Sequence, residues 1–135
     1  MSQIKIRAAL ETALASIAPP IDTAYQGFGY TPVTGQPYQA VYLLPAEPNN
    51  WAMGDASRQE SGIIQINLQY PTGQGQGSAP AGARAELIRA LFHRGASFTK
   101  DGITVQIERT PEIGGGREDN GRWFLPVKVR WFCNL

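Results

Sequence analysis

Two segments of the chain repeat apolar residues at the spacing of an amphipathic α-helix. Residues 2–17 carry one apolar stripe with a period of 3.6 residues, made up of Ile6, Leu10, Ala13, Leu14 and Ile17. Pro19 and Pro20 end this helix, because proline lacks an amide proton and disfavours helix in the residue before it. A second helix is predicted over residues 81–94, followed by Gly95 as its C-terminal cap, with an apolar face of Leu87, Ile88, Leu91 and Phe92.

Four further segments have the composition or the alternation of β-strands. Tyr38 to Leu44 is rich in aromatic and β-branched residues. Residues 64–70 and 103–107 alternate apolar with polar residues, and the turn Asp101-Gly102 precedes the second of these strands. The last strand is predicted from Trp123 to about Phe132. Because Pro126 cannot donate a ladder hydrogen bond, we expect that strand to lie at a sheet edge or to be bulged there.

The order helix, strand, strand, helix, strand, strand predicts an α+β fold. We expect a two-layer sandwich in which two helices pack on one face of a mainly antiparallel or mixed sheet of four to five strands. A short extended piece within residues 21–37 is also expected. A length of 135 residues is typical of one domain, so residues 1–135 are expected to form a single domain.

Three stretches between the predicted elements are long and rich in glycine, proline and uncharged polar residues. They span residues 45–60, 71–80 and 110–121. Connections in a domain of this size usually run to about 4–6 residues, and longer ones are usually functional or become ordered on binding. We therefore interpret the three stretches as loops that serve assembly.

Composition excludes several classes of function. Hydrophobic residues make up 42% of the chain and charged residues 17%, and the formal net charge is +1, so no nucleic-acid specificity is expected. A single cysteine, Cys133, excludes an internal disulfide, and a single histidine, His93, excludes a histidine-rich metal site. No apolar run approaches the ~18–20 residues of a membrane span, and the N-terminus has no stretch suited to a signal peptide. We expect a soluble protein with no membrane partner.

The residues that could carry chemistry do not form a known catalytic pattern. The glycine loop from Gly73 to Pro80 has serine or proline where a dinucleotide fingerprint needs its third glycine. His93 and Cys133 are better explained as a helix-capping histidine and a half-buried thiol. The adjacent carboxylates Glu118 and Asp119 lie in a charged, solvated loop, which does not separate their pKa values as catalysis requires. We predict no catalytic, cofactor-binding or metal-binding residues and no enzymatic activity.

Several residues are instead candidates for subunit contact. Trp51 either folds back on the core or anchors a contact, and Arg84, at the centre of a helical apolar stripe, either reaches outward to solvent or faces a partner subunit. An uncharged outer row of the sheet suits pairing with another protein at low desolvation cost, or is simply solvated; it consists of Gln65, Asn67, Gln69, Thr104 and Gln106. The candidate subunit-interface residues are Trp51, Arg58, Gln74, Gln76, Arg84, Arg117, Glu118 and Asp119.

Three features together resemble a family of small phage proteins. They are the strand Ser61-Gly-Ile-Ile-Gln-Ile-Asn-Leu-Gln-Tyr-Pro71, the glycine loop that follows it, and the helix Ala83-Arg-Ala-Glu-Leu-Ile-Arg-Ala-Leu-Phe-His-Arg-Gly95. A G-x-x-Q-x-x-x-x-x-P-x-G strand is matched by Gly62, Gln65, Pro71 and Gly73. In this pattern and in the order of its elements the chain is similar to the tail terminators of long-tailed bacteriophages.

The resemblance implies a structural role in a phage or prophage tail. Tail terminators form a hexameric ring that caps the tail tube, stops its polymerisation and offers the surface for head joining. The implied partners are further copies of the chain, the tail tube protein and the head–tail connector protein. The implied location is the virion tail, assembled in the cytoplasm of the bacterial host. We expect the isolated protein to be monomeric and to form its ring on the tail.

Two alternatives remain open at this stage. Within the structural class, the chain could be a neck or head–tail connector component or a minor tail protein. From a different class, it could be a small-ligand-binding module whose pocket, between sheet and helices, has Tyr25, Tyr30, Tyr42 and Trp51 as walls.

Overall fold

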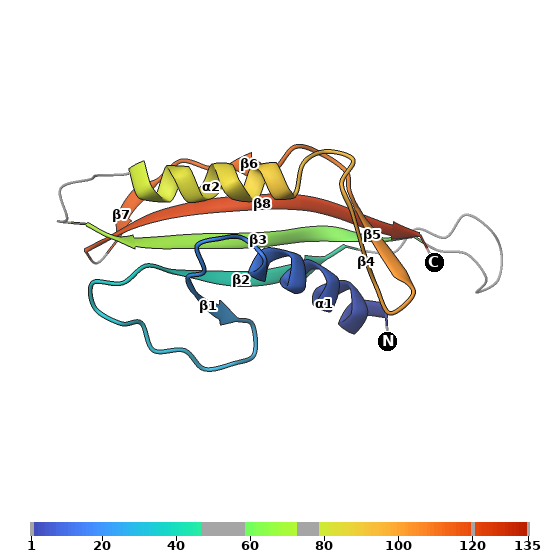
Figure 1. Ribbon diagram of the computed structural model, residues 1–135, viewed down its shortest axis with the longest axis horizontal. Coiled ribbons are helices and arrows are strands. Elements are labelled where there is room, and N and C mark those ends of the chain that lie inside the picture. The colour runs from blue at the N-terminus through green and yellow to red at the C-terminus, as the bar shows by residue number, and fades with distance from the viewer. Residues whose placement is uncertain (1, 47–58, 73–78, 120, 135) are drawn as a thin grey trace.

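A curved mixed sheet and two helices make up the computed structural model, which describes residues 2–46, 59–72, 79–119 and 121–134 (Figure 1). Within these residues the sheet has eight strands and curves into a half-barrel. The elements are α1 (Ser2–Ala15), β1 (Asp22–Tyr25), β2 (Tyr38–Pro45), β3 (Gln59–Pro71), α2 (Ala79–Leu91), β4 (Ser97–Lys100), β5 (Ile103–Ile107), β6 (Glu112–Ile113), β7 (Arg117–Asp119) and β8 (Arg122–Asn134).

The prediction of a two-layer sandwich with a sheet of four to five strands is wrong. The strand order is β1-β2-β3-β8-β5-β4, and β6 and β7 also pair with β8. The short extended piece expected within residues 21–37 is β1, of four residues. The three strands that were not predicted, β4, β6 and β7, have two to four residues each. Such strands are too short to show an alternating pattern, and β6 and β7 lie inside the stretch 110–121 that was predicted to be a loop.

The two longest strands, β3 and β8, form the centre of the sheet. They pair antiparallel along their whole length, from Gln59 opposite Asn134 to Pro71 opposite Arg122, with no shift in register. On its other side β8 pairs with β5, β6 and β7. Therefore β8 is neither an edge strand nor bulged against β3, as its proline had led us to expect.

Pro126 is tolerated because the second ladder of β8 is interrupted beside it. Its carbonyl oxygen accepts a hydrogen bond from the Gly114 amide at 2.9 Å, in the gap between β6 and β7. The N–H and C=O of one strand residue point to the same side, so the donor that proline lacks also faces this gap. The ladder to β3 loses nothing.

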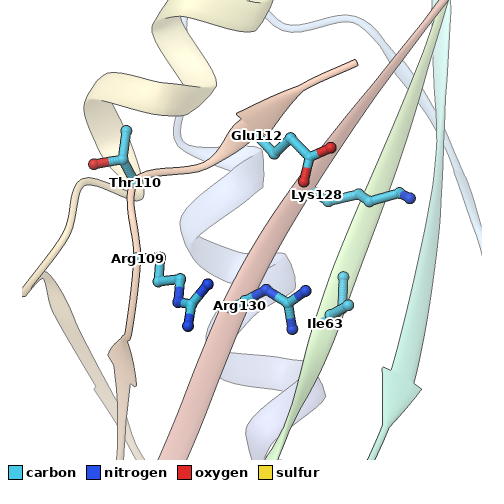
Figure 2. Close-up of a pocket in the computed structure, with 6 residues that line it drawn as sticks. All are labelled: Ile63, Arg109, Thr110, Glu112, Lys128 and Arg130. Atoms are coloured by element: carbon cyan, nitrogen blue, oxygen red, sulfur yellow. The ribbon is translucent and has the colours of Figure 1, made fainter.

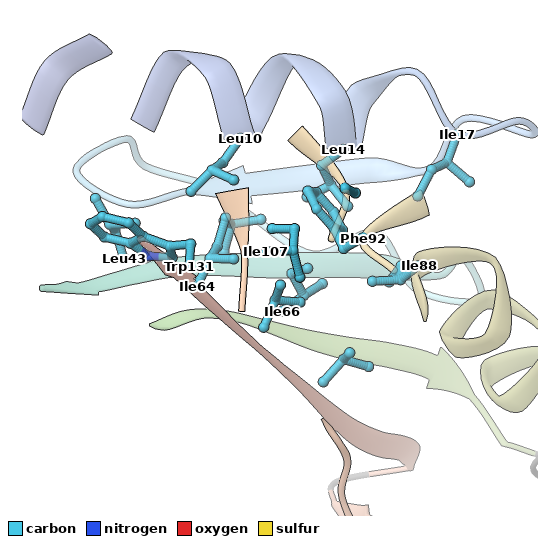
Figure 3. Close-up of a cluster of buried hydrophobic side chains, with 14 of the residues drawn as sticks. Leu10, Leu14, Ile17, Leu43, Ile64, Ile66, Ile88, Phe92, Ile107 and Trp131 are labelled. Carbon is cyan, nitrogen blue, oxygen red and sulfur yellow. The ribbon is translucent and has the colours of Figure 1, made fainter. Parts of the chain in front are cut away.

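The core fills the concave side of the sheet, where both helices lie. Of the apolar stripe predicted over residues 2–17, Ile6, Leu10, Leu14 and Ile17 are buried, and Ala13 is partly buried. Figure 3 shows Leu10 and Leu14 of α1, and Ile17 just after it, facing the sheet. The face predicted for α2 is partly wrong, because Leu87 is 43% exposed. The buried face of α2 consists of Ala81, Arg84, Ala85 and Ile88. Small residues bring this helix close to the strands.

Gly62, the first residue of the phage-like strand pattern, lies where two other strands crowd β3. A Cβ atom at this position would lie 2.5 Å from the carbonyl oxygen of Leu44 and 2.9 Å from the indole Cζ2 of Trp131. No side chain fits there without moving backbone. Trp131 is fully buried, so the glycine gives the largest core side chain its space.

The predicted hairpin turn is confirmed. Asp101 and Gly102 both have positive φ angles, 52° and 80°, as a two-residue type I′ turn requires, and they join β4 to β5. No helix within the described residues is long and apolar enough to cross a membrane.

Candidate interaction surface

The convex side of the sheet presents a face without charge across β2 and β3. Side chains alternate along a strand, so every second residue of each strand points to this side. From β2 and β3 these are Tyr38, Ala40, Tyr42, Leu44, Ser61, Ile63, Gln65, Asn67 and Gln69, which we call the uncharged face. Tyr42 is 40% and Leu44 47% exposed. Solvated faces of antiparallel sheets are normally polar, so exposed apolar side chains among amides are typical of a contact surface.

The polar side chains of the uncharged face partly satisfy one another. Gln65 donates from Nε2 to Oδ1 of Asn67 at 2.9 Å. The residues of the predicted outer row all point to the convex side. Gln65, Asn67 and Gln69 lie on the uncharged face, and Gln106 of β5 pairs with the convex-side residue Phe132 of β8. Thr104 lies two residues before Gln106 on β5 and therefore points to the same side. Burying such a face strips no ion of its hydration, and the desolvation of its amides is offset where they form hydrogen bonds with the partner.

A groove of about 260 Å³ borders the uncharged face where β8 lies beside the chain leading into β6 (Figure 2). Lys128 and Arg130 project into it from the convex side of β8, opposite Gln65 and Ile63 of β3. Arg109 lines it from the segment after β5. The complete lining is Ile63, Arg109, Thr110, Glu112, Lys128 and Arg130.

A second groove, of about 300 Å³, lies on the convex side near the β1 edge of the sheet. The tyrosines predicted to line a ligand pocket, Tyr25, Tyr30 and Tyr42, do line this groove together, but it is an open surface feature and not a pocket between sheet and helices. Phe28 at its rim is 77% exposed. The Tyr30 hydroxyl donates to Oδ2 of Asp22 at 3.1 Å. The fourth predicted wall, Trp51, lies outside the described residues.

The segment that carries the second groove is held by Arg122 at the start of β8. Its guanidinium donates to the carbonyl oxygens of Gln36 at 2.7 Å and Val33 at 2.8 Å, and it lies 5.0 Å from the centroid of the Tyr38 ring. Arg122 was not predicted to hold this segment. No sequence pattern predicts these hydrogen bonds, because their acceptors are backbone carbonyls, which every residue carries.

The predicted subunit-contact residues fall into three groups. Trp51, Arg58, Gln74 and Gln76 lie outside the described residues. Arg117, Glu118 and Asp119 lie together on β7, opposite Phe124, Trp123 and Arg122 of β8. The Arg117 guanidinium lies 4.8 Å from the centroid of the Phe124 ring. The structure brings these three residues to one edge of β8.

Arg84 is enclosed by its own chain. Only 4% of its surface is exposed, and it donates from Nη1 to the carbonyl oxygen of Pro19. Its Nε has no hydrogen-bond partner. Burial lowers the pKa of the guanidinium from its usual value, and Tyr70 acts in the opposite direction. The side chain therefore neither reaches outward to solvent nor lies on the surface of the isolated chain.

The candidate nucleophile and base have separate structural settings. His93 is exposed at the end of α2, with Nδ1 3.1 Å from the carbonyl oxygen of Arg94. Cys133 is fully buried and not half-buried as expected, on the concave side of β8. Among the residues that the structure describes, no group of histidine, cysteine and acidic side chains is arranged to hold a metal ion.

Comparisons with known proteins identify the family. A family model described as phage tail terminator protein matches residues 5–131. Among solved structures, one chain of unstated function aligns with 98% of this chain and 96% of its own length, at 27% sequence identity and a TM-score of 0.79. No curated protein matches. The match of the family model covers nearly the whole of the sheet and both helices.

Proposed function

The chain belongs to the phage tail terminator family, and from this premise we propose that it caps the end of the tail tube as a ring, stops tube polymerisation and presents the surface to which the head joins. The family is structural, so the chain is a structural component of the phage tail. The family match over residues 5–131 is the observation that carries the proposal.

The uncharged face supports ring formation. In a ring each subunit uses two different patches, one for each neighbour, and the contact closes only if both fit. A face of amides and tyrosines with exposed Leu44 can be buried without stripping water from ions. We propose this face as one of the two patches and a hexamer as the assembled state.

Ring formation on the tail, with a monomer in isolation, is the mode of assembly that we propose. Introducing one charge at the centre of the face, Asn67→Lys, should block assembly on tails, because the lysine would be buried without a partner. Ser97→Lys, on the exposed edge strand β4, adds the same charge elsewhere and should assemble normally. Equal assembly of both variants would contradict this use of the face.

No step of this function requires catalysis, and we propose that the chain is not an enzyme. The proposed partners are other copies of the chain, the tail tube protein and the head–tail connector protein, which it would meet during assembly in the host cytoplasm. None of these contacts calls for a cofactor or a nucleic-acid sequence.

Deleting the gene and imaging the particles tests the proposal directly. A terminator defect gives overlong tails without heads, because nothing stops the tube. If the chain were instead a neck or connector component, the deletion would give tails of normal length and heads that leak. Tails of normal length in the deletion would therefore overturn the capping role.

A further inference from the structure

The groove beside the uncharged face is lined by more positive than negative side chains among the residues that the structure describes. Three of its lining residues are cations, Arg109, Lys128 and Arg130, and one, Glu112, is an acid. No ion pair among the described residues involves Lys128 or Arg130. The remaining cation, Arg109, has Nε 4.0 Å from Oε1 of Glu108, and its side chain is 70% exposed.

The three cations come from two segments that pairing of β6 with β8 brings together. Lys128 lies directly opposite Glu112 in this pairing, and Arg130 is two residues further along the same side of β8 (Figure 2). Like charges that share a groove repel one another, so a bound anion would relieve the repulsion as well as gain attraction. The apolar Ile63 forms part of the same wall and joins the groove to the uncharged face.

We propose that this groove is the docking site for carboxylate side chains of a neighbouring tail protein, a partner different from the copy of the chain that packs on the uncharged face. This inference rests on the proposed function, because it names the chemistry that a tail partner must present: at least two acidic side chains that reach the three cations together. Charge pairs at the rim of a contact fix the register of the partner and speed its association.

Carboxylates fit the groove better than nucleic-acid phosphates do. Glu112 lines the groove and Glu108 lies beside Arg109, so a phosphate backbone running along the face would meet both acids. Separate carboxylates can reach the cations and avoid those acids. The chain's net charge of +1 supplies no wider field to hold a polyanion.

Binding of a defined probe to the isolated chain tests the site. The probe is hexaglutamate, titrated at low ionic strength while backbone amide shifts are recorded by NMR, with hexaglutamine and a hexathymidylate as comparison probes. Shifts should concentrate at residues 109–112 and 128–130 with hexaglutamate alone. They should fade as salt is raised to about 0.3 M, where screening acts within a few ångströms.

A matched pair of charge reversals separates the groove from the rest of the surface. Lys128→Glu with Arg130→Glu should weaken hexaglutamate binding by about tenfold or more, since two attractive contacts become repulsive. Lys5→Glu with Lys100→Glu changes the net charge equally, on α1 and at the end of β4, outside the groove lining. This pair should weaken hexaglutamate binding by about twofold at most, through the general field. Equal weakening by both pairs, or stronger binding of hexathymidylate, would overturn the proposal.

Two further measurements separate this proposal from the proposed function. If the groove reversal changes the oligomeric state of the isolated chain, the groove joins copies of the chain and the proposal of an acidic neighbour is wrong. If hexaglutamate does not bind but deletion of the gene gives overlong tails, the docking proposal for the groove is wrong and the capping role stands. Tails of normal length in the deletion would overturn the capping role whether or not the groove binds hexaglutamate.

Discussion

Two segments of similar composition are held to the sheet by different means. Residues 26–37 and 110–119 are both rich in glycine and proline. Only a short extended piece was predicted within residues 21–37, and a loop was predicted over residues 110–121. The second segment pairs its backbone with β8 through β6 and β7. The first makes its long-range contacts mostly through side chains, above all the two bonds from Arg122 to the carbonyl oxygens of Val33 and Gln36.

Each means of attachment makes its segment sensitive to a different kind of substitution. Strands paired by backbone hydrogen bonds tolerate most side-chain substitutions. The pairing is disrupted when a new side chain overlaps a neighbouring residue and pushes the strand away. A segment held by a few side-chain hydrogen bonds opens when one of those side chains is lost and tolerates most other changes within itself. The two segments should therefore respond in opposite ways to steric and to polar substitutions.

The largest effect is expected from Gly116→Ala, between β6 and β7. A Cβ atom here would lie within 2.6 Å of the Cζ2, Cε2 and Nε1 atoms of the Trp123 indole, closer than any real Cβ contact. Either the indole or β7 must move, and we expect the free energy of unfolding to fall by about 2 kcal/mol. Urea unfolding followed by circular dichroism measures the loss.

The neighbouring glycine is the control for that prediction. At Gly115 an added Cβ would meet no atom, so Gly115→Ala should be neutral or slightly stabilising, by up to about 0.5 kcal/mol, through lower entropy of the unfolded chain. Equal losses at the two glycines would show that the segment needs glycine flexibility and not space for the indole.

A smaller but more local effect is expected from Arg122→Ala. Two charge-assisted hydrogen bonds and a ring contact are lost at a partly exposed site, so we expect the unfolding free energy to fall by about 1–2 kcal/mol. In the parent protein the Gln36 amide donates a hydrogen bond to the Val33 carbonyl oxygen. In the variant, hydrogen exchange should accelerate at this amide and stay unchanged in β6 and β7. Faster exchange throughout 111–119 would show that the two segments are coupled.

Gln26 is a second support of the 26–37 segment, and its loss should cost about 1 kcal/mol. Its Oε1 accepts hydrogen bonds from the Leu43 amide at 3.0 Å and from Arg7 Nη1 at 3.1 Å. The pairing of β1 with β2 ends at Val41, so the Gln26 side chain supplies the Leu43 amide with the acceptor that a β1 carbonyl would otherwise provide. Gln26→Ala leaves the Leu43 amide without its acceptor. Gln26→Glu keeps an acceptor and adds an ion pair, so its stability at neutral pH should match or exceed that of the parent. Thermal unfolding of the two variants side by side tests whether the acceptor is what matters.

Helices and strands with a hydrophobic pattern of seven or more residues were predictable from the sequence. Short strands that form only because they pair with a neighbouring strand were not. The stripe of α1 and the alternation from Ile64 to Tyr70 extend over seven or more residues, so their periods are visible. In contrast β6 and β7 exist because β8 offers them an unpaired edge, which no pattern within residues 110–121 reveals. On α2 the pattern predicted that Leu87 is buried, but Ala81 and Ala85 face the sheet instead, because the helix packs closely against the strands.

The same limit applies to the interaction surface. The row Gln65, Asn67 and Gln69 was visible as the polar half of one alternating strand. The groove was not, because Arg109 and Lys128 are far apart in sequence and meet only through the register of β6 on β8. The spacing of Lys128 and Arg130, two residues apart on a strand with apolar alternates, was the one available signal.

The smallest effect is expected from Arg117→Ala, which forms a matched pair with Arg122→Ala. Each arginine lies over an aromatic ring at a similar distance, 4.8 Å from Phe124 for Arg117 and 5.0 Å from Tyr38 for Arg122. Only Arg122 also bonds two backbone carbonyls of a distant segment. Removing Arg117 should therefore cost about 0.5 kcal/mol, the value of an exposed cation–ring contact, because β7 stays paired with β8. The difference between the two losses then gives the contribution of the bonds to Val33 and Gln36. A loss at Arg117 equal to that at Arg122 would mean that the 110–119 segment, too, depends on a side chain, and the contrast between the segments would disappear.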